Sequence, residues 1–287
     1  MNKSIVIIAF KYPPYSGVGA FRWANLSYHL AELGVLAHVI TVRWKGKPDS
    51  SFLHVLDHPN IIIHYLPSIG FHNIRYMKGE TEFENFFLKI IKRLIRTVLR
   101  PWYYLDEAQQ WRRFMVPYVL KLIRAENIKV LIATGAPYSV NYAASIIKKK
   151  LGSRIFLIQD MRDPWNDLPN YPKSFGNERR KKKSIEIEKF SLDLADQVVT
   201  VTKGFAKCFR KITSTPVQVI YSGYPGDPVF KSNQKHNNKI SLIYAGGFAH
   251  GRDLALLDFL YRVKDAELLD QLTLVVYSSS SQKVRCM

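Results

Sequence analysis

The amino-acid sequence predicts an α/β protein: a Rossmann-like, doubly wound parallel sheet followed by an incomplete second Rossmann-like domain. Short β-branched apolar runs alternate with longer amphipathic stretches, which is the pattern of a parallel sheet covered by helices. A polar stretch rich in Gly, Pro and Asn, at residues 222–239, interrupts this alternation. We therefore expect a first domain over residues 1–235 and the beginning of a second over residues 236–287.

Each apolar run predicts one buried strand. In the first domain the runs are Ser4–Phe10, Leu36–Val42, Ile61–Leu66, Lys129–Ala133, Ile155–Gln159, Gln197–Val201 and Val217–Tyr221. The stretches with apolar residues at helical spacing are Phe21–Leu33, which Gly34 is expected to end, Phe83–Leu99, Trp111–Ala125, Ser139–Leu151, Glu178–Leu194 and Lys203–Lys211. The second domain is expected to hold strand Ile240–Ala245, helix Arg252–Val263 and strand Leu272–Tyr277. About fifty residues are too few for an open α/β sheet, so we expect a truncated domain.

The chain is strongly basic. Its 287 residues include 42 Lys and Arg against 23 Asp and Glu, a formal net charge of +19, which indicates an anionic partner. Acidic lipid and a phosphorylated substrate both fit. Nucleic acid fits less well, because the basic residues are scattered and no reader motif accompanies them.

Cysteine usage and hydropathy exclude several classes of protein. Cys208 and Cys286 are far apart, and no His, Cys or carboxylate cluster has metal spacing, so neither a disulfide framework, a metal site nor a cofactor is expected. The N-terminal apolar run is too short for a signal peptide, and no segment approaches the roughly 18 apolar residues of a membrane span. We expect a cytoplasmic protein with at most peripheral contact with the inner membrane face.

Two glycines follow the first predicted strand and precede its helix. Gly17 and Gly19 allow the backbone to pass close to a phosphate or a sugar, although a turn that simply needs glycine explains them equally well. A dinucleotide fingerprint would need a third glycine, and Arg22 stands in its place.

Polar residues also follow two later strands, at the edge where open α/β sheets bind ligands. After the strand at 129–133 come Thr134, Gly135 and Ser139, with Ser139 as a helix N-cap in the purely structural interpretation. After the strand at 155–159 come Asp160, Arg162 and Asp163, two carboxylates and a guanidinium that suggest a functional site more than a structural ion pair.

The stretch from Phe83 to Arg100 has an apolar stripe and a basic face at helical spacing, with one acid, Glu84. Such a helix can lie in the surface of an anionic membrane, with aromatic residues 102–104 beside it. The alternative is an ordinary helix packed on the core. A second basic run, Arg179–Lys183, opens another predicted helix and has no specific interpretation.

With these segments in view, the chain resembles family 4 type glycosyltransferases of the GT-B architecture. The similarity covers Lys3 to about Val276 and is carried by the segments YPPYSGVGAFRWANLSYHLAELG, IATGAPYS, LIQDMRDPW, LADQVVTVTKG, VIYSGYPGDPVF and LIYAGGFAHGRD. It implies retaining transfer of a sugar from a nucleotide-sugar to a glycan or lipid-linked acceptor in cell-surface polysaccharide synthesis. It also implies that paired glutamates of the donor pocket lie beyond residue 287, so we expect a truncated chain of reduced activity.

The resemblance assigns a role to each candidate residue. It implies acceptor binding by the first domain at Gly17, Gly19, Thr134, Gly135 and Ser139, and catalysis at Asp160, Arg162 and Asp163. It implies donor binding by Gly246, Gly247 and Arg252, the last as the cation that neutralises the diphosphate. The alternative from another class is a non-catalytic module that retains acceptor or partner binding.

Overall fold

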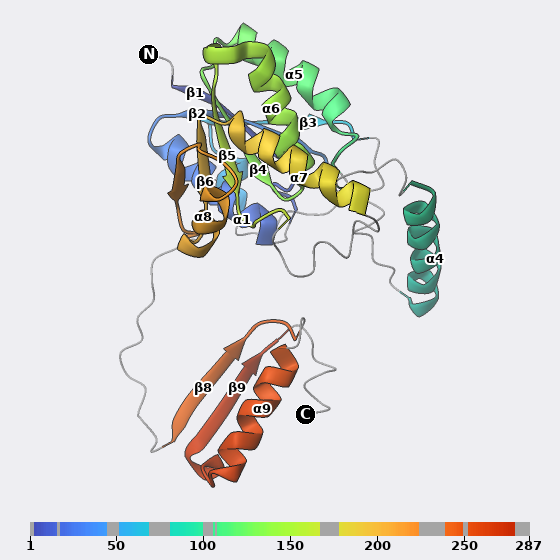
Figure 1. The fold of residues 1–287 in the computed structure, drawn as a ribbon, viewed down its shortest axis with the longest axis vertical. Helices are drawn as coiled ribbons and strands as arrows, with labels where there is room; N and C mark the ends of the chain where they lie inside the picture. The colour runs from blue at the N-terminus through green and yellow to red at the C-terminus, as the bar shows by residue number, and fades with distance from the viewer. Residues whose placement is uncertain are drawn as a thin grey trace. The chain divides into compact units, whose positions relative to one another are not determined.

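The computed structural model describes residues 3–15, 18–44, 52–68, 81–99, 106, 108–166, 178–223, 239–248 and 252–278. The chain divides into two compact units, Met1–Pro225 (unit 1) and Gly226–Met287 (unit 2) (Figure 1). The boundary predicted near residue 235 falls in a segment outside the described residues. Each unit is described by itself below.

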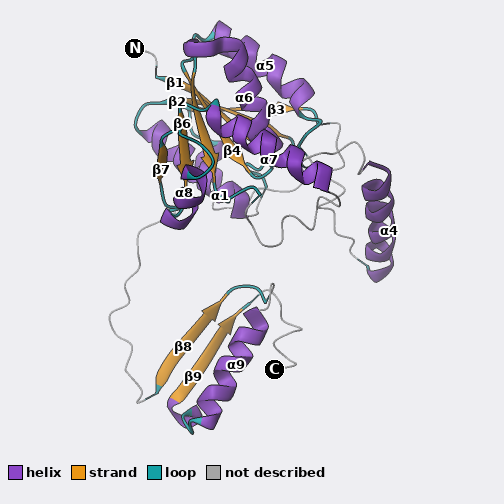
Figure 2. Cartoon of the chain, viewed as in Figure 1, coloured by secondary structure: helices purple, strands orange, loops and turns teal. Residues whose placement is uncertain are grey.

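Unit 1 contains a seven-stranded sheet in which all neighbouring strands are parallel (Figure 2). The strands are β1 (Ser4–Ala9), β2 (Leu36–Val42), β3 (Ile61–Leu66), β4 (Val130–Gly135), β5 (Phe156–Met161), β6 (Gln197–Thr200) and β7 (Val217–Val219). Their spatial order is β3-β2-β1-β4-β5-β6-β7. The order reverses between β1 and β4, which makes that position the topological switch point of a doubly wound sheet. The predicted fold class is confirmed.

Helices cover both faces of this sheet, because successive side chains of each strand point to opposite sides. The helices of unit 1 are α1 (Val18–Glu32), α2 (Leu53–Leu56), α4 (Glu82–Leu99), α5 (Arg112–Ala125), α6 (Ser139–Leu151), α7 (Glu178–Asp193) and α8 (Lys203–Arg210). Along β1, Val6 and Ile8 belong to a core cluster that contains Trp111 and residues of α5 and α6. Ile5 and Ile7 belong to the opposite cluster, which contains Trp23 of α1.

The ends of several elements differ from the sequence prediction. Both β4 and β5 extend two residues further than predicted, so Thr134 and Asp160 lie inside strands and not after them. The single-turn helix α2 was not predicted, since four residues carry no helical period. Gly34 ends α1 as predicted: its φ is +76°, and the amide of Val35 donates to the carbonyl of Leu30.

The described part of unit 2 contains a parallel pair of strands and the helix between them. Strand β8 (Ile240–Ala245) pairs with β9 (Leu272–Tyr277), and α9 (Arg252–Asp265) lies between them in the sequence. Among its described apolar side chains only Phe248 and Leu256 are buried, and several, including Ile243 and Tyr277, are exposed. Its described part therefore has a small core.

Candidate functional site

At the switch point, candidate residues of β4 and β5 lie at one edge of the sheet of unit 1, beside the end of β1. In the strand register Ala9 of β1 is paired with Thr134 of β4, and Thr134 is paired with Asp160 of β5. These three positions are at the carboxyl ends of their strands, the edge at which open α/β sheets bind ligands. The structure thus brings together two of the polar groups predicted from separate segments.

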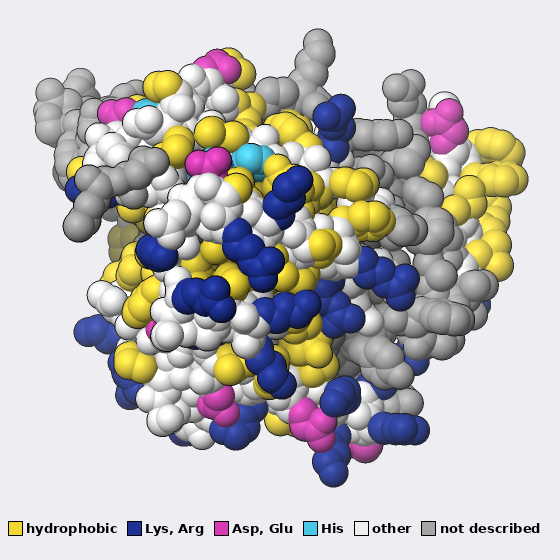
Figure 3. All heavy atoms as spheres, turned by 90° about the horizontal axis from the view of Figure 1, so that it is seen from above, with side chains coloured by type: hydrophobic (Ala, Val, Ile, Leu, Met, Phe, Trp, Pro, Cys, Tyr) yellow, Lys and Arg dark blue, Asp and Glu magenta, His cyan; other side chains and the backbone are white. Residues whose placement is uncertain are grey.

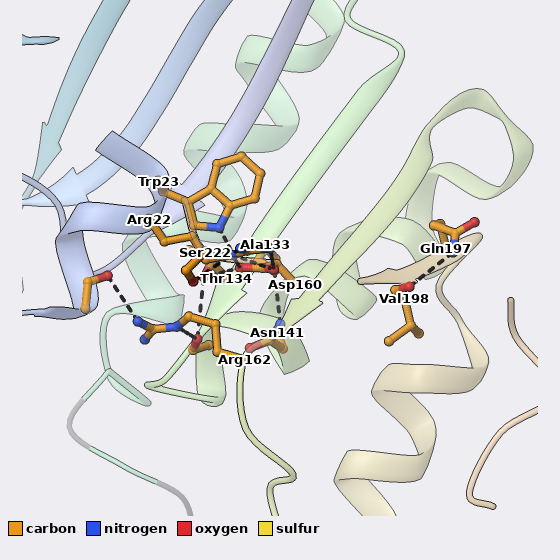
Figure 4. Close-up of polar contacts among 12 residues, drawn as sticks. Arg22, Trp23, Ala133, Thr134, Asn141, Asp160, Arg162, Gln197, Val198 and Ser222 are labelled. Atoms are coloured by element: carbon orange, nitrogen blue, oxygen red, sulfur yellow. Dashed lines mark hydrogen bonds and ion pairs between the residues drawn. The ribbon is translucent and has the colours of Figure 1, made fainter. Parts of the chain in front are cut away.

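Asp160 is the centre of a buried polar cluster at this edge (Figure 4). Its side chain is fully buried and accepts hydrogen bonds from the guanidinium of Arg22 at 3.0 to 3.3 Å. It also accepts from the indole of Trp23 at 2.6 Å and from the hydroxyl of Thr134 at 2.9 Å. A buried carboxylate with this many donors is held in one orientation. We conclude that Asp160 and Thr134 stabilise and shape the edge, since their polar atoms already have internal partners.

Arg162 does not pair with either neighbouring carboxylate. Its guanidinium donates to the carbonyl oxygens of Gly135 at 2.7 Å, Gly19 at 3.3 Å and Ala136 at 3.3 Å. It therefore ties the segment after β4 to the first turn of α1. The structural ion pair that the sequence analysis weighed as the alternative is absent between Arg162 and Asp160, because Arg22 is the cation that pairs with Asp160.

The glycines at this edge serve close packing. A Cβ at Gly135 would lie 2.5 Å from the Oδ1 atom of Asn141 and 2.7 Å from a ring carbon of Tyr138, so only glycine fits there. A Cβ at Gly19 would lie 3.0 Å from the Cδ atom of Lys11, a flexible side chain. Gly17 lies outside the described residues.

Ser139 is not a helix N-cap, contrary to the structural interpretation of the sequence. It is the first residue of α6, and the preceding Tyr138 makes no side-chain cap. The carboxylate of Asp106 takes that role: it accepts from the backbone amide of Ser139 at 2.9 Å and from its hydroxyl. An anion at a helix N-terminus is favourable for the helix dipole. The Ser139 hydroxyl is thereby engaged inside the protein.

Asp163 differs from the other two residues predicted to be catalytic. Its backbone carbonyl accepts a hydrogen bond from the hydroxyl of Tyr138 at 3.2 Å. Within the described ranges, its half-buried carboxylate has neither a hydrogen-bond partner nor an ion-pair partner. The ring of Tyr138 stacks on the buried Trp165 with centroids 4.9 Å apart, which gives this segment a rigid base.

The three donor-side residues lie at the carboxyl end of β8 and the start of α9. Gly246 adopts a φ of +153° that L-residues rarely adopt, and its amide donates to the carbonyl of Tyr277. The carbonyl of Gly247 accepts from the hydroxyl of Tyr244 at 3.0 Å. Arg252 is the first residue of α9 and is exposed. A strand-to-helix turn with glycines and a cation is an arrangement that can bind a phosphate.

Sequence reasoning missed the residues that organise the edge. Arg22 and Trp23 lie in the first turns of α1. The sequence indicated there only that Arg22 replaces the third glycine of a dinucleotide fingerprint. Glu188 of α7 is also buried, and it accepts from the backbone amide of Trp165 at 3.0 Å and from Asn166 at 2.6 Å. The signal in the sequence that could have identified Arg22 and Glu188 is a charged residue on the apolar face of α1 and of α7. In the described ranges, no group of three or more His, Cys, Asp and Glu side chains is placed to hold a metal ion.

Comparison with known proteins assigns the fold. No protein-family model and no curated protein sequence matches the chain. Among solved structures it resembles sucrose-phosphate synthase from Thermosynechococcus elongatus, with a TM-score of 0.54 and 14% identity over 96% of this chain and 70% of that one. It also resembles the catalytic domain of starch synthase IV from Arabidopsis thaliana, solved with ADP and acarbose, with a TM-score of 0.53 and 11% identity over 98% of this chain and 70% of that one.

The fold is the Rossmann-like fold of GT-B glycosyltransferases. A third similar structure, UGT73P12 from Glycyrrhiza uralensis, has a TM-score of 0.44 and 12% identity over 76% of this chain. This chain spans 48% of the length of that protein. At these identities, the two structures with TM-scores above 0.5 show the fold alone, and the activity of this chain is a separate question.

Proposed function

We propose that the chain is a glycosyltransferase of the family 4 type that moves a sugar from a nucleotide-sugar to a glycan or lipid-linked acceptor. The reaction is retaining, uses no resident cofactor, and belongs to cell-surface polysaccharide synthesis on the cytoplasmic side. The observation that carries the proposal is the GT-B fold, with polar groups of separate segments at the switch point of unit 1. Open α/β sheets bind their ligands at that position.

On the acceptor side, we assign binding to the carboxyl edge of unit 1. Asp163 has the carboxylate that lacks an internal partner among the described residues, so it is our candidate for contact with an acceptor hydroxyl. The Asp160 cluster and Arg162 act as positioning groups, because each already binds protein atoms. A rigid, internally bonded base is what precise placement of a reacting hydroxyl requires.

On the donor side, we assign the diphosphate to the turn between β8 and α9. Transfer breaks the bond between the anomeric carbon and a diphosphate oxygen, while the acceptor oxygen bonds to that carbon and its proton passes to the leaving diphosphate. Negative charge develops on the leaving diphosphate, and the exposed guanidinium of Arg252 can stabilise it. The starch synthase IV structure holds ADP and acarbose, a nucleoside diphosphate and a glycan analogue, which are the classes we propose for this chain.

A second candidate function is a binding module without catalysis. It is favoured by the full burial of Asp160, which removes one of the three predicted catalytic groups from contact with substrate. In that case unit 1 binds the acceptor, and no sugar is transferred.

Calorimetric titration with UDP-, GDP- and ADP-sugars, followed by a transfer assay with the sugar that binds, tests the proposal. Micromolar binding with transfer to added glycan or polyprenyl-phosphate-linked acceptor supports the transferase and identifies the nucleotide. Saturable acceptor binding by a folded chain, without transfer or nucleotide-sugar hydrolysis, supports the binding module. Absence of both donor and acceptor binding contradicts both functions.

A further inference from the structure

Helix α4 has a large apolar face that the described part of the chain leaves uncovered. Six large apolar side chains along it are between 38% and 72% exposed: Phe83, Phe86, Phe87, Ile90, Ile91 and Leu94. Their spacing places them on one side of the helix, and the rings of Phe83 and Phe87 lie 5.6 Å apart. In Figure 3 hydrophobic side chains form a continuous yellow strip at the upper right, along α4. An exposed strip of this kind marks an interaction surface.

The opposite side of α4 is basic. Lys89 and Arg93 are exposed there, and the sequence of α4 contains two further basic residues. The sequence of α4 also contains two acids, Glu82 and Glu84, and Glu84 belongs to a capping box with Thr81. The amide of Glu84 donates to the Thr81 hydroxyl at 3.2 Å, and the Glu84 carboxylate accepts from the amide of Thr81 at 3.3 Å. Both acids lie in the first turn, and four basic residues against two acids leave α4 with a net positive charge.

We propose that α4 lies in the surface of an anionic lipid bilayer, with its apolar face among the acyl chains and its basic side at the headgroups. The combination of large apolar residues on one face with Lys and Arg on the other is the composition of interfacial helices. In the described ranges, no helix is long and apolar enough to cross a membrane. A helix that lies in the interface is compatible with that finding.

Charge complementarity favours lipid over a second protein as the occupant. The chain has a formal net charge of +19, so two copies repel each other, whereas anionic headgroups attract every copy. Eighteen residues of helix are about 27 Å long, enough to seat all six apolar side chains in one layer of a bilayer. The capping box stabilises the start of the helix, which reduces the ordering cost of binding.

The inference goes beyond the proposed function and does not depend on catalysis. Lipid binding can be measured whether or not the chain transfers sugar, so failure of one proposal leaves the other untouched. The test uses the full chain and vesicles of phosphatidylcholine with phosphatidylglycerol in equal parts, with vesicles of phosphatidylcholine alone as reference. The measured quantity is the partition coefficient from sedimentation.

We expect the wild-type chain to sediment with the anionic vesicles at low salt and to bind them far more weakly at high salt. Phe87→Ser and Leu94→Ser should each lower the partition coefficient by about tenfold or more, because each removes a large apolar side chain from the bilayer. The matched control is Leu33→Ser: Leu33 is similarly exposed at the end of α1 and should have no effect.

A charge control distinguishes α4 from the rest of the basic surface. Lys89→Gln with Arg93→Gln removes two charges from α4, and Lys149→Gln with Lys150→Gln removes two exposed charges from the last turn of α6. Figure 3 looks onto the face on which other Lys and Arg side chains gather. We expect a loss of about tenfold for the α4 pair and a clearly smaller loss for the α6 pair.

Three outcomes would overturn the proposal. In the first, Phe87→Ser binds vesicles as the wild type does. In the second, both charge pairs lower binding equally, which would assign it to general surface charge. In the third, the α4 variants change the melting temperature or the oligomeric state by light scattering while vesicle binding is unchanged, which would assign the apolar face to another part of the chain or to a second copy.

Discussion

The carboxyl ends of strands in the two units look alike in sequence and differ in structure. In unit 1, Asp160 at the end of β5 is buried and bonded to Arg22, Trp23 and Thr134. In unit 2, Arg252 after β8 is exposed at the start of α9. A charged residue after an apolar run is therefore a buried structural group in unit 1, and in unit 2 it is an exposed group that a ligand can reach. Burial and internal partners, not residue type, separate the two.

The largest expected effect comes from removing the carboxylate of the scaffold. Asp160→Ala leaves the guanidinium of Arg22 buried without its anion, which should lower the free energy of unfolding of unit 1 by about 3–5 kcal/mol. Urea denaturation followed by tryptophan fluorescence measures this, because all five tryptophans precede the division at Pro225. Glu186→Ala, which removes an exposed partner of Lys183, is the control and should cost less than about 1 kcal/mol. Equal effects of the two variants would show that the buried cluster is not a scaffold.

The second test compares glycines at the two turns. Gly135→Ala forces a Cβ against Asn141 and Tyr138 and should destabilise unit 1 by about 1–3 kcal/mol. At Gly247 nothing lies within 4 Å of the position of an added Cβ, so Gly247→Ala should leave stability unchanged. Thermal melting by circular dichroism, with fluorescence for unit 1, measures both. A neutral Gly135→Ala would mean that the edge of unit 1 is as open as the turn of unit 2.

The third test asks whether the open turn binds the donor. Arg252→Gln should weaken nucleotide-sugar binding by about tenfold while stability stays unchanged, since a charge-assisted contact to phosphate is lost and no buried group is exposed. Arg262→Gln is the control: it lies in the same helix, and its partner is the exposed Asp258. Calorimetry with the nucleotide-sugar that the chain binds gives both affinities. If the two variants bind equally well, the donor phosphates do not contact Arg252.

The smallest effect is a dependence of unit 1 on pH. Burial lowers the pKa of His38 and His64 from 6.5, each histidine being next to the other, and Glu126 opposes the shift at His38. Because the unfolded state binds protons more readily, stability is full above about pH 6.5 and falls as the pH drops from there toward the lowered folded-state values. The loss is at most about 1.4 kcal/mol per pH unit for each histidine.

Urea titrations of tryptophan fluorescence between neutral and mildly acidic pH measure this slope. His64→Gln should flatten it, because it removes one of the two titrating rings and the one bonded to the hydroxyl of Tyr118. His29→Gln, at an exposed site of α1, should not. A slope that persists in His64→Gln would assign the pH dependence to other groups.

The fold was predictable from sequence because its signal is local. Each β-branched run became a strand, as at Leu36–Val42, since buried parallel strands need continuous apolar residues. The meeting of Thr134 and Asp160 at one edge of the sheet was predictable from the sequence, whereas their hydrogen-bond partners were not. Nothing local shows that Arg22 bonds to a residue 138 positions away, or that Asp106 caps the helix that begins at Ser139. Such contacts depend on how helices and strands pack against one another, and the hydrophobic periodicity of the sequence does not reveal that packing.

The distance along the chain between Arg22 and Asp160 also has a consequence during synthesis. At typical translation rates, the second residue leaves the ribosome roughly ten seconds after the first. The residues of β1 and α1 are synthesised long before Asp160, the anion that pairs with Arg22. The guanidinium of Arg22 therefore remains hydrated until β5 emerges. The nascent chain can thus complete the edge of this sheet only after more than half of its length has been translated.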